Sequence, residues 1–538
     1  MNNLTRNADL IATRLARAGC RFAFGIPGGE VLALCDALSR AGLRVVLVKH
    51  ENAGGFLAEG VHHVTGAPAV LFATLGPGVA NAVNVVANAW QDRVPLIFLT
   101  GCVDPADEQT YTHQVFDHGA LLRPITKASL TAVPGAVGTV IDKAVAIATD
   151  PQPGPVHVDV PIGVAQAAAD EAPAPLRPRP GPTAPAEGEA LAEARRWFRE
   201  AHRPLMVAGV DALNDGSAAA VAEFAVTHRI PLITTYKAKG ILDEDHPLSL
   251  GGAGLSPRAD RVLLPLLARS DLVIFAGYDP IEMRVGWRDP LPAGLRSIEF
   301  ASVPNTHFMH RAGLAFTCTV GAGLAALATE GGPAGSWAEE APARARAELA
   351  EAFAGPARWG PHEVFAVARA VLPRDTIATA DSGAHRILLS QVWRCPEPRS
   401  LLQSSGLCTM GCAVPLAMGA KLAAPERPVV AFVGDAGLEM VLGELATARD
   451  LELPVIIVVL ADGSLALIAL KQRSAGYPGL AVDFGGTDFA AVARAMGGHG
   501  AEVRDADTLA GELRAALGRR CFSLIACRID GDDYDGAF

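Results

Sequence analysis

The chain has 538 residues, of which half are hydrophobic and 19% are charged. That length exceeds what one hydrophobic core supports, so about three or four domains of ordinary size are expected, with three as the starting count. The composition excludes a disordered protein. The net charge of -11 comes without a basic stretch interleaved with aromatic residues, which excludes the usual signature of a nucleic-acid-binding protein.

Three features of the sequence bear on where the protein resides. Residues 1–19 predict an amphipathic helix with charges throughout, without the apolar centre of a signal peptide. The longest apolar stretch, residues 454–470, is interrupted by Asp462 and Gly463 and therefore fails as a membrane span. The nine cysteines form neither a Cys-x-x-Cys pair nor a metal-ligand spacing, which indicates reduced thiols. We expect a cytoplasmic protein that binds neither membrane nor nucleic acid.

The first part of the chain, residues 1–166, alternates short apolar runs with helical patterns. This alternation predicts a parallel sheet covered by helices. The strand candidates are RFAFGIPGG, RVVLVKHE, APAVLFATLGPG, VPLIFLTG and PGPVHVDVP. Residues 167–189 are rich in Pro and Ala and have no hydrophobic period, so they predict a linker.

The same alternation returns twice. Residues 190–330 predict a central domain, residues 331–355 a second linker, and residues 356–538 a third domain that contains DTIATADSGAH, RPVVAFVGDAG, LPVIIVVLADG and CFSLIACRID. We therefore predict an α/β fold of three consecutive doubly wound parallel-sheet domains. Ligands of the first and third sheets should lie beyond the carboxyl ends of the strands. Such a fold hosts many unrelated functions, so it does not decide the function by itself.

Two carboxylates stand where buried strands of the third domain end. Asp435 follows VVAFVG, and Asp462, 27 positions further on, follows VIIVVLA. An ionised side chain at such a place is costly unless it is paired or binds a cation. Two carboxylates and a carbonyl suit Mg2+ bridging a diphosphate, whose oxygens Gly434 and Gly437 would let backbone N–H groups approach. Taken alone, the Gly-Asp turn predicts only a helix N-cap at Asp435.

The spacing of these carboxylates resembles the thiamine diphosphate signature, which begins Gly-Asp-Gly and ends in an Asn pair. The resemblance implies that Asp435, Asp462 and the carbonyl of Ser464 bind Mg2+. The chain departs from the signature at Ala436, where the motif has Gly, and at Ala461 and Asp462, where it has two Asn. These departures keep open a protein of another class, a catalytically weak or inactive relative with an assembly or regulatory role.

Glu51 follows the apolar run RVVLVKH and opens a helix rich in Gly and Ala. By itself, a Glu at this place predicts a first-turn partner of the helix dipole. Thiamine diphosphate enzymes carry their glutamate in the same setting, so the resemblance implies that Glu51 shares a proton with N1′ of the aminopyrimidine ring. His62 and His63, further along the same helix, are expected to face solvent.

Blocks similar to those of acetolactate synthases continue over nearly the whole chain in the same order, among them TLGPGVANAVNVVANAWQDRVPLIFLTG, PITKAS, DSGAH and SSGLCTMG. The blocks at residues 277–287 and 481–498 are similar to the catabolic, flavin-free branch. By this resemblance, residues 1–166 form a pyrimidine-binding domain and residues 356–538 a diphosphate- and Mg-binding domain. The cofactor-binding residues that it implies are Pro27, Gly28, Gly29, Gly76, Pro77, Asn81, Ser382, Gly383, Ala384, His385, Gly406, Cys408, Met410, Gly434, Ala436, Gly437 and Leu467.

The reaction that the resemblance implies is carboligation of 2-oxo acids, dependent on thiamine diphosphate and Mg2+. In acetolactate synthases, pyruvate is decarboxylated and its two-carbon unit is transferred to a second 2-oxo acid; FAD is not expected here. Gln114 and Lys127 match positions that line the substrate channel, although ordinary polar surface residues would look the same. The family also implies a homodimer or homotetramer with the active site between two chains.

The choice of substrate stays open. Gly29 and Phe72 stand where simple decarboxylases of the family carry acidic or His side chains, which favours transfer to a carbonyl. Glu30 stands where a small residue is common, and Lys471 where the anabolic acetolactate synthases carry Trp. The alternative is therefore a related carboligase, acyltransferase or decarboxylase that acts on another 2-oxo acid or an aldehyde.

Overall fold

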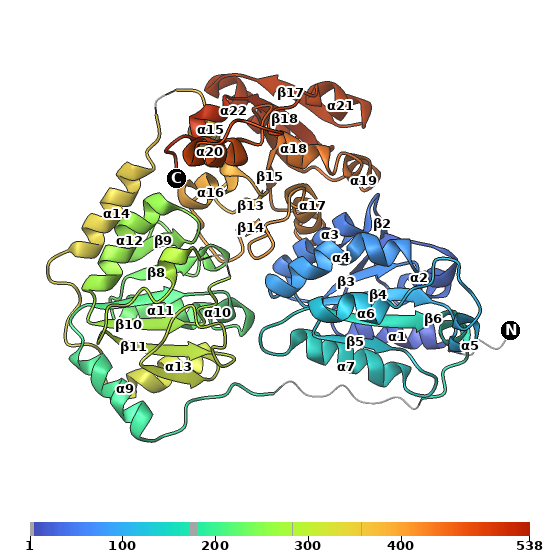
Figure 1. The fold of residues 1–538 in the computed structure, drawn as a ribbon, viewed down its shortest axis with the longest axis horizontal. Coiled ribbons are helices and arrows are strands. Elements are labelled where there is room, and N and C mark those ends of the chain that lie inside the picture. The colour runs from blue at the N-terminus through green and yellow to red at the C-terminus, as the bar shows by residue number, and fades with distance from the viewer. Residues whose placement is uncertain (1–4, 172–179, 282, 357) are drawn as a thin grey trace.

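The computed structural model describes residues 5–171, 180–281, 283–356 and 358–538. Part of the first expected linker, residues 172–179, and position 282 within the block 277–287 lie outside the described residues. Three α/β domains follow one another along the chain, each built around a six-stranded parallel sheet (Figure 1). The predicted fold class is confirmed.

The first domain has the strand order β2-β1-β3-β4-β6-β5. Its strands are β1 (Phe22–Ile26), β2 (Arg44–Leu47), β3 (Ala69–Ala73), β4 (Leu96–Cys102), β5 (Ala128–Thr131) and β6 (Val156–Pro161). Its helices, including the 3-10 turns η, are α1 (Asn7–Arg17), η1 (Gly29–Val31), α2 (Leu32–Arg40), α3 (Glu51–Thr65), α4 (Pro77–Gln91), α5 (Pro105–Glu108), α6 (His118–Leu122), η2 (Arg123–Ile125), α7 (Val137–Thr149) and α8 (Ile162–Gln166).

The central domain has the order β12-β11-β10-β7-β8-β9, which is the Rossmann arrangement. Its strands are β7 (Pro204–Ala208), β8 (Leu232–Thr235), β9 (Ser249–Ala253), β10 (Leu272–Ala276), β11 (Arg296–Ala301) and β12 (Leu314–Thr317). Its helices are α9 (Glu189–Glu200), α10 (Asp211–Asn214), α11 (Ala218–Thr227), η3 (Tyr236–Ala238), α12 (Pro257–Arg269), η4 (Val285–Trp287), α13 (Val320–Leu327) and η5 (Ala328–Glu330).

The segment expected as the second linker contains a helix, α14 (Ala341–Ala352). Ala341 and Ala345 of this helix are buried in the core of the central domain beside Trp337. The indole of Trp337 also donates a hydrogen bond to the carbonyl of Pro204, the first residue of β7. The segment therefore joins the packing of the central domain before the chain continues into the third one.

The third domain has the order β14-β13-β15-β16-β18-β17. Its strands are β13 (Ile377–Ala380), β14 (Leu401–Gln403), β15 (Val429–Gly434), β16 (Ile456–Ala461), β17 (His499–Val503) and β18 (Ser523–Arg528). Its helices are α15 (Pro361–Val371), α16 (Ala384–Val392), α17 (Ala413–Ala423), α18 (Asp435–Glu439), α19 (Glu444–Asp450), α20 (Ala466–Ala475), α21 (Phe489–Ala495), α22 (Ala506–Ala516) and η6 (Gly531–Tyr534).

The first and third sheets share one strand order, because each places its first strand between its second and third. In such sheets the connections leave in opposite directions from the first and third strands, and the crevice between their carboxyl ends is where ligands bind. In the first domain this switch point lies between β1 and β3, and in the third between β13 and β15. The motifs PGG and DSGAH directly follow β1 and β13, LGPG follows β3 after Thr74, and GDAG begins at Gly434, the last residue of β15.

Helices α3 and α17 pack the first domain against the third within one chain (Figure 1). Two glycines allow the close approach: a Cβ on Gly60 would lie 2.3 Å from the carbonyl oxygen of Leu416, and one on Gly419 would lie 2.0 Å from that of Leu57. The largest hydrophobic core therefore runs through both domains.

The prediction that His62 and His63 face solvent is wrong. Only 5% of His62 is exposed, and its Nδ1 lies 2.8 Å from the carbonyl oxygen of Ala67. Nε2 of His63 lies 3.1 Å from Oε1 of the buried Glu59. The first sheet covers one side of α3 and α17 covers another, so the helix has little surface left for solvent.

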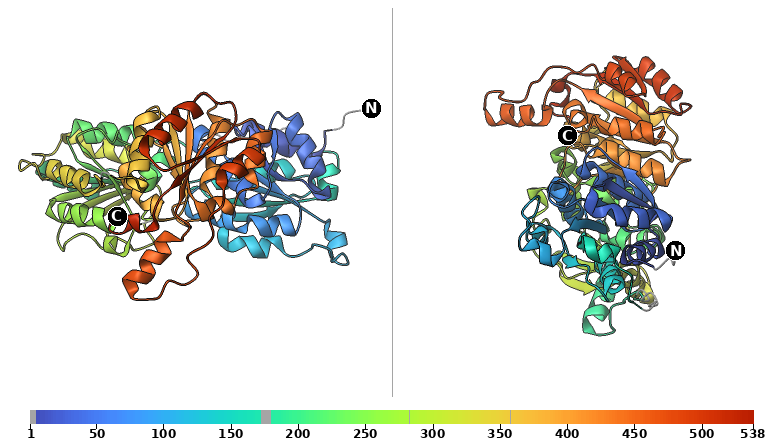
Figure 2. Two further views of the ribbon diagram at one scale, coloured as in Figure 1. Left: turned by 90° about the horizontal axis from the view of Figure 1, so that it is seen from above. Right: turned by 90° about the vertical axis from the view of Figure 1, so that its right-hand side faces the viewer.

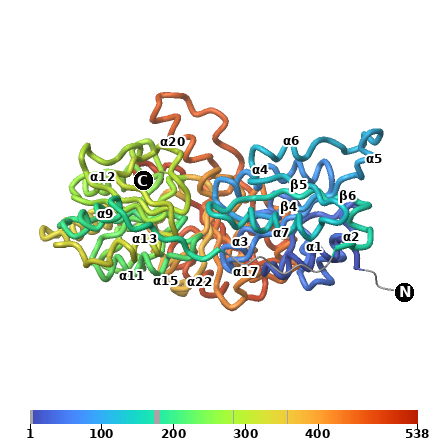
Figure 3. The backbone as a smooth tube through the Cα atoms, turned by 90° about the horizontal axis from the view of Figure 1, so that it is seen from below, coloured from blue at the N-terminus to red at the C-terminus, as the bar shows by residue number. Residues whose placement is uncertain are grey.

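The third domain lies between the other two when the molecule is viewed from above (Figure 2). Helix α20 and the segment after it stand out from the body of the chain (Figure 3), and the side chains of Tyr477 and Leu480 in that segment are exposed. Within the described part of the chain, every helix is too short or too polar to cross a bilayer.

Candidate active site

Glu51 occupies the first turn of α3 at the carboxyl end of the first sheet. The chain enters the helix through His50, whose ring accepts a hydrogen bond from the N–H of Asn52. Only 4% of Glu51 is exposed, and its Oε2 accepts a hydrogen bond of 3.0 Å from Nδ2 of Asn81 on α4. A Cβ on Gly78 would lie 3.2 Å from Oε1. The structure thus brings Glu51 and Asn81 together, and a side chain at position 78 would press against the carboxylate.

Two glycine turns face each other beside Glu51, after β1 and after β3. A Cβ on Gly28 would lie 2.2 Å from Oγ1 of Thr74, and Gly76, with φ at +68°, leaves only 2.4 Å between a Cβ and the carbonyl oxygen of Gln114. Gln114 therefore lies against the predicted turn of Gly76 and Pro77. Pro27 and Gly29 flank Gly28 in the other turn.

The carboxylates of Asp435 and Asp462 lie close together at the ends of β15 and β16. Asp435 accepts hydrogen bonds from the N–H groups of Gly463 (2.7 Å) and Ala436 (2.9 Å), and Asp462 accepts one from Ser464 (2.9 Å). Burial, and after it the charge of Asp435, raises the pKa of Asp462 to about 7. A cation between the two side chains would remove this repulsion, so the donor set fits Mg2+.

The segment of Ser382, Gly383, Ala384 and His385 begins α16 at the switch point of the third sheet. The His385 ring lies next to Gly434, where a Cβ would be 3.3 Å from its Cε1. Ser382 Oγ and His385 Nε2 are buried and have no hydrogen-bond partner among the described residues. Two buried polar atoms beside the GDAG turn are what a bound diphosphate could satisfy.

Asp381, which directly follows β13, is a site residue that the sequence prediction missed. Its carboxylate accepts hydrogen bonds from the N–H groups of Gly411 (2.9 Å), Cys412 (3.2 Å) and Ser382 (2.9 Å). It thereby ties the DSGAH segment to the segment that contains Met410. The sequence does contain the pattern that would have predicted this residue, because Asp381 is a carboxylate at the carboxyl end of a buried strand, as Asp435 is.

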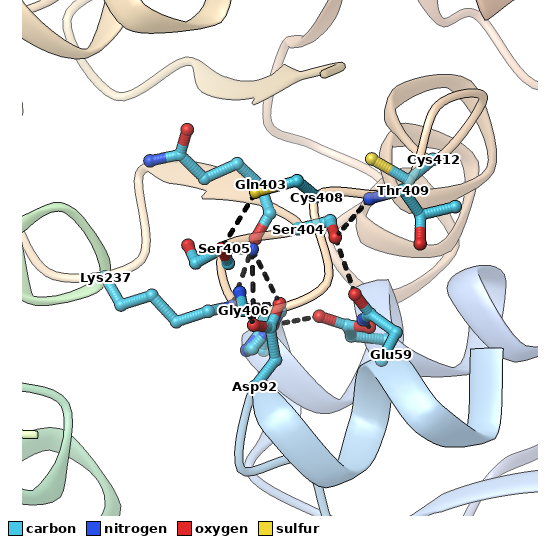
Figure 4. Close-up of polar contacts among 12 residues, drawn as sticks. Glu59, Asp92, Lys237, Gln403, Ser404, Ser405, Gly406, Cys408, Thr409 and Cys412 are labelled. Carbon is cyan, nitrogen blue, oxygen red and sulfur yellow. Dashed lines mark hydrogen bonds and ion pairs between the residues drawn. The ribbon is translucent and has the colours of Figure 1, made fainter. Parts of the chain in front are cut away.

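Side chains of the first domain hold the segment 404–410 of the third (Figure 4). Asp92, at the end of α4, accepts hydrogen bonds from the N–H groups of Ser405 (3.0 Å) and Gly406 (2.6 Å). Nζ of Lys237, from the central domain, lies 2.9 Å from the same carboxylate. All three domains therefore meet at Asp92, which the sequence prediction did not single out.

A second line of hydrogen bonds reaches the same segment from α3 (Figure 4). Asn88 donates from Nδ2 to Glu59 (2.9 Å) and accepts at Oδ1 from the hydroxyl of Ser404 (2.6 Å), whose Oγ accepts from the N–H of Thr409 (2.9 Å). Between the segment's two fixed parts, Cys408 is exposed and has φ at +55°. The first domain thus holds Gly406 directly, and it holds the segment that carries Cys408 and Met410 through Ser404.

Lys127 and Leu467 lie apart from these contacts. The ammonium of Lys127 donates to the carbonyls of Asp150 and Gln152, both at 3.2 Å, and burial lowers its pKa. Leu467, on α20, is half-buried and packs against the core of the third domain. Predicted site residues from the first domain and from the third otherwise form two clusters, one around each switch point.

Two like sheets with polar clusters at their switch points define an α/β protein with candidate ligand sites at the carboxyl ends of two parallel sheets. Family models agree with this interpretation: residues 5–121 match the thiamine pyrophosphate enzyme N-terminal TPP binding domain, residues 191–327 the central domain, and residues 381–527 the C-terminal TPP binding domain.

Relatives match over almost the full length. The acetolactate synthase isozyme 1 large subunit of Escherichia coli (strain K12) is 30% identical, covering 98% of this chain and 94% of its own. An acetolactate synthase of Bacillus subtilis (strain 168) is 29% identical with the same coverage. A Pseudomonas aeruginosa protein described as "Probable 2-ketoarginine decarboxylase" is 32% identical, covering 96% and 92%. The chain belongs to the thiamine pyrophosphate enzyme family and is similar to acetolactate synthases.

Proposed function

We propose that the chain is a carboligase of 2-oxo acids of acetolactate synthase type, dependent on thiamine diphosphate and Mg2+. It would decarboxylate pyruvate and transfer the two-carbon unit to a second 2-oxo acid in the cytoplasm. One observation carries the proposal: buried Glu51 with Asn81 lies at one switch point, and the paired carboxylates of Asp435 and Asp462 lie at the other. The two ends of thiamine diphosphate need these two chemistries.

Each cluster has its own role in this proposal. Glu51 shares a proton with the aminopyrimidine ring, and Asn81 holds its carboxylate in place. Asp435, Asp462 and the carbonyl of Ser464 would hold Mg2+, while Ser382 and His385 offer polar atoms to the phosphates. When bound, the cofactor supplies the electron sink for cleavage next to the 2-oxo carbonyl. Gln114 and Lys127 are proposed to line the path of the substrate.

The proposed active unit contains two chains, as a homodimer or homotetramer. Among the described residues, Glu51 shares no hydrogen bond or ion pair with Asp435 or Asp462, and the two domains of one chain meet through α3 with α17 and through Asp92 and Asn88 with segment 404–410. A cofactor held at both ends is therefore proposed to lie between the first domain of one chain and the third domain of another.

Replacement of the proposed proton-sharing group tests this function. Glu51→Gln should keep the fold and bind thiamine diphosphate, yet lose the exchange of the cofactor's C2 proton with deuterium, by a factor of at least about a hundred. Exchange is followed by NMR after acid quench, and Glu108→Gln, an exposed carboxylate of the same domain, serves as the control. Unchanged exchange in Glu51→Gln would refute the role of Glu51.

The alternative of a non-catalytic relative rests on Ala436 and Ala461, which stand where the motif has Gly and Asn. Titration calorimetry with thiamine diphosphate in the presence of Mg2+ distinguishes the proposed enzyme from a non-catalytic relative. A saturable binding heat supports the enzyme, whereas no heat at about millimolar ligand, where binding is worth only about 4 kcal/mol, supports the alternative.

A second candidate is a decarboxylase or carboligase whose 2-oxo acid carries a cationic end, as the name of the Pseudomonas aeruginosa relative indicates for that protein. Glu30 favours it, since its half-buried carboxylate accepts a hydrogen bond from Thr74 (2.5 Å) beside the Gly28 turn and could pair with a guanidinium. Product analysis decides: acetolactate from pyruvate alone supports the first candidate, and turnover only of 5-guanidino-2-oxopentanoate supports the second.

A further inference from the structure

A buried polar cluster lies next to the Gly76 turn and includes side chains of β4, β5 and β6. His118, on α6, places Nδ1 2.8 Å from Oδ1 of Asp159, which also accepts a hydrogen bond of 2.6 Å from the hydroxyl of Thr100. His157 lies between Thr100 (Nε2, 2.7 Å) and Ser129 (Nδ1, 2.8 Å). Only 5% of His118 and none of His157 is exposed.

The hydrogen bonds of this cluster fix where its protons are. The N–H of Gly76 can only donate, and it points at Nε2 of His118 at 3.2 Å, so that nitrogen is an acceptor and the ring is neutral. The other nitrogen, Nδ1, then carries the proton and donates a hydrogen bond to Asp159. Burial alone would raise the pKa of Asp159, but the hydrogen bond from His118 and the His157 ring close to the carboxylate hold that pKa well below its usual range.

The hydrogen bonds of the cluster also argue against a metal ion here, although the side chains of His118, His157 and Asp159 are close enough to share one. Both nitrogens of each ring already have a partner: Gly76 and Asp159 for His118, and Thr100 and Ser129 for His157. A metal would have to displace these bonds. The cluster is therefore complete as a set of hydrogen bonds.

Gly76 connects the cluster to Glu51. It is the N-cap of α4, and because its φ of +68° and the nearby Gln114 carbonyl exclude a side chain, only contacts to its backbone can hold it. The first turns of α4 carry Gly78 and Asn81, which lie against the two oxygens of the Glu51 carboxylate. A shift of the Gly76 turn would move both of them.

We propose that His118 is a positioning residue: its neutral ring, oriented by Asp159, holds the Gly76 amide and so sets α4 against Glu51. This inference rests on the proposed function of Glu51. Protonation of the ring would place an N–H opposite the Gly76 N–H, two donors face to face, and release the turn at low pH. The titratable groups around His118 are Asp159 and His157 on β6, Asp117 before α6, Arg123 after it and Cys102 at the end of β4.

Three variants test the proposal. His118→Gln can still accept from Gly76 but does not titrate, His118→Phe keeps a ring without an acceptor, and His157→Gln changes the same cluster without reaching Gly76. The measurement is the rate of C2 proton exchange in the thiamine diphosphate–Mg2+ holoenzyme, from about pH 5 to pH 8, where histidine titrates.

His118→Phe should lose exchange by roughly tenfold to a hundredfold with little change in cofactor affinity, since misplacement affects reactivity before binding. His118→Gln should keep the rate of the native chain and lose the fall in rate at low pH, whereas His157→Gln should keep that fall. Native exchange in His118→Phe, or equal loss in His118→Gln and His118→Phe, would overturn the proposal.

Hydrogen–deuterium exchange of the peptide around residues 74–80 gives a readout that needs no catalysis. The Gly76 region should exchange faster in His118→Phe than in the native chain, and at the native rate in His118→Gln. If the native chain lacked C2 exchange, the proposed function would fail while this measurement still decided the positioning role. The zinc content of the purified proteins gives a further check. Tightly bound zinc in the native chain that is lost in His157→Gln would overturn the proposal as well.

Discussion

Two glutamates on α3 show how the surroundings separate residues of one type. Glu51 starts the helix and accepts a hydrogen bond from Asn81, while Glu59, two turns later, is 1% exposed and accepts from Asn88. Burial, opposed by Lys237 and Asn88, raises the pKa of Glu59 to about 7. The residue thus changes charge in the range where the protein is expected to work.

Glu59 makes the stability of the folded chain depend on pH. Because its folded pKa of about 7 lies above the usual value of 4.5, the stability that the protonated form provides is fully present below about pH 4.5 and is lost as pH rises through about 7. The difference amounts to roughly 3 kcal/mol. Glu59→Gln should remove it, so that the variant is more stable than the native chain at about pH 8 but not at about pH 5.

Urea unfolding at several pH values measures this effect. Glu426→Gln, an exposed carboxylate of the third domain, should leave the dependence of the native chain unchanged. Equal slopes of stability against pH for Glu59→Gln and the native chain would show that Glu59 does not titrate in this range.

At the scale of elements, the sheets were predictable because central parallel strands are buried on both faces and appear as continuous apolar runs. The runs VVAFVG and VIIVVLA are followed by Asp435 and Asp462, so the sequence alone places these two carboxylates at one edge of a sheet. Helix α3 was harder to predict. Its pattern includes His62 and His63, which the rest of the fold largely covers, and helical periodicity cannot tell which sides of a helix become buried.

The contact of α3 with α17 depends on glycine at the crossing point. In Gly419→Ala, the new Cβ would lie 2.0 Å from the backbone carbonyl of Leu57, which cannot move without the helix. We expect a loss of about 3 kcal/mol or more in the free energy of unfolding, measured by thermal or urea unfolding.

A glycine in open space provides the matched control. Gly511 lies within α22 with nothing near its Cβ position. Gly511→Ala should therefore stabilise the protein by about 0.5 to 1 kcal/mol, because alanine loses less conformational freedom in a helix. A stabilised Gly419→Ala would contradict the close packing of the two helices.

On the scale of the whole molecule, the junction of the three domains could not be predicted from the sequence. Asp92 binds the N–H groups of Ser405 and Gly406 across 313 and 314 positions of the chain, and no spacing rule relates residues so far apart. The family resemblance implied that Gly406 contacts the cofactor, yet it carried no information about which side chain fixes that segment.

Asp92→Asn tests how strongly the domains are coupled. The substitution leaves the buried ammonium of Lys237 without its carboxylate, and breaking a buried pair in this way costs about 3 to 5 kcal/mol. We expect a lower midpoint of unfolding and weaker binding of thiamine diphosphate, since segment 404–410 loses its anchor.

The double variant Asp92→Asn, Lys237→Met distinguishes an energetic coupling between the two residues from independent destabilisation by each substitution. If the pair couples the domains, the double variant should be destabilised by less than the sum of the two single variants. Strict additivity would show that Asp92 and Lys237 act independently.

The shared connectivity of the first and third sheets also bears on ligand stoichiometry. In a closed pair of identical subunits related by a twofold axis, every heterotypic contact is repeated once. The proposed pocket, made from the first sheet of one copy and the third sheet of the other, would then occur twice, and saturation would require one coenzyme molecule for each polypeptide.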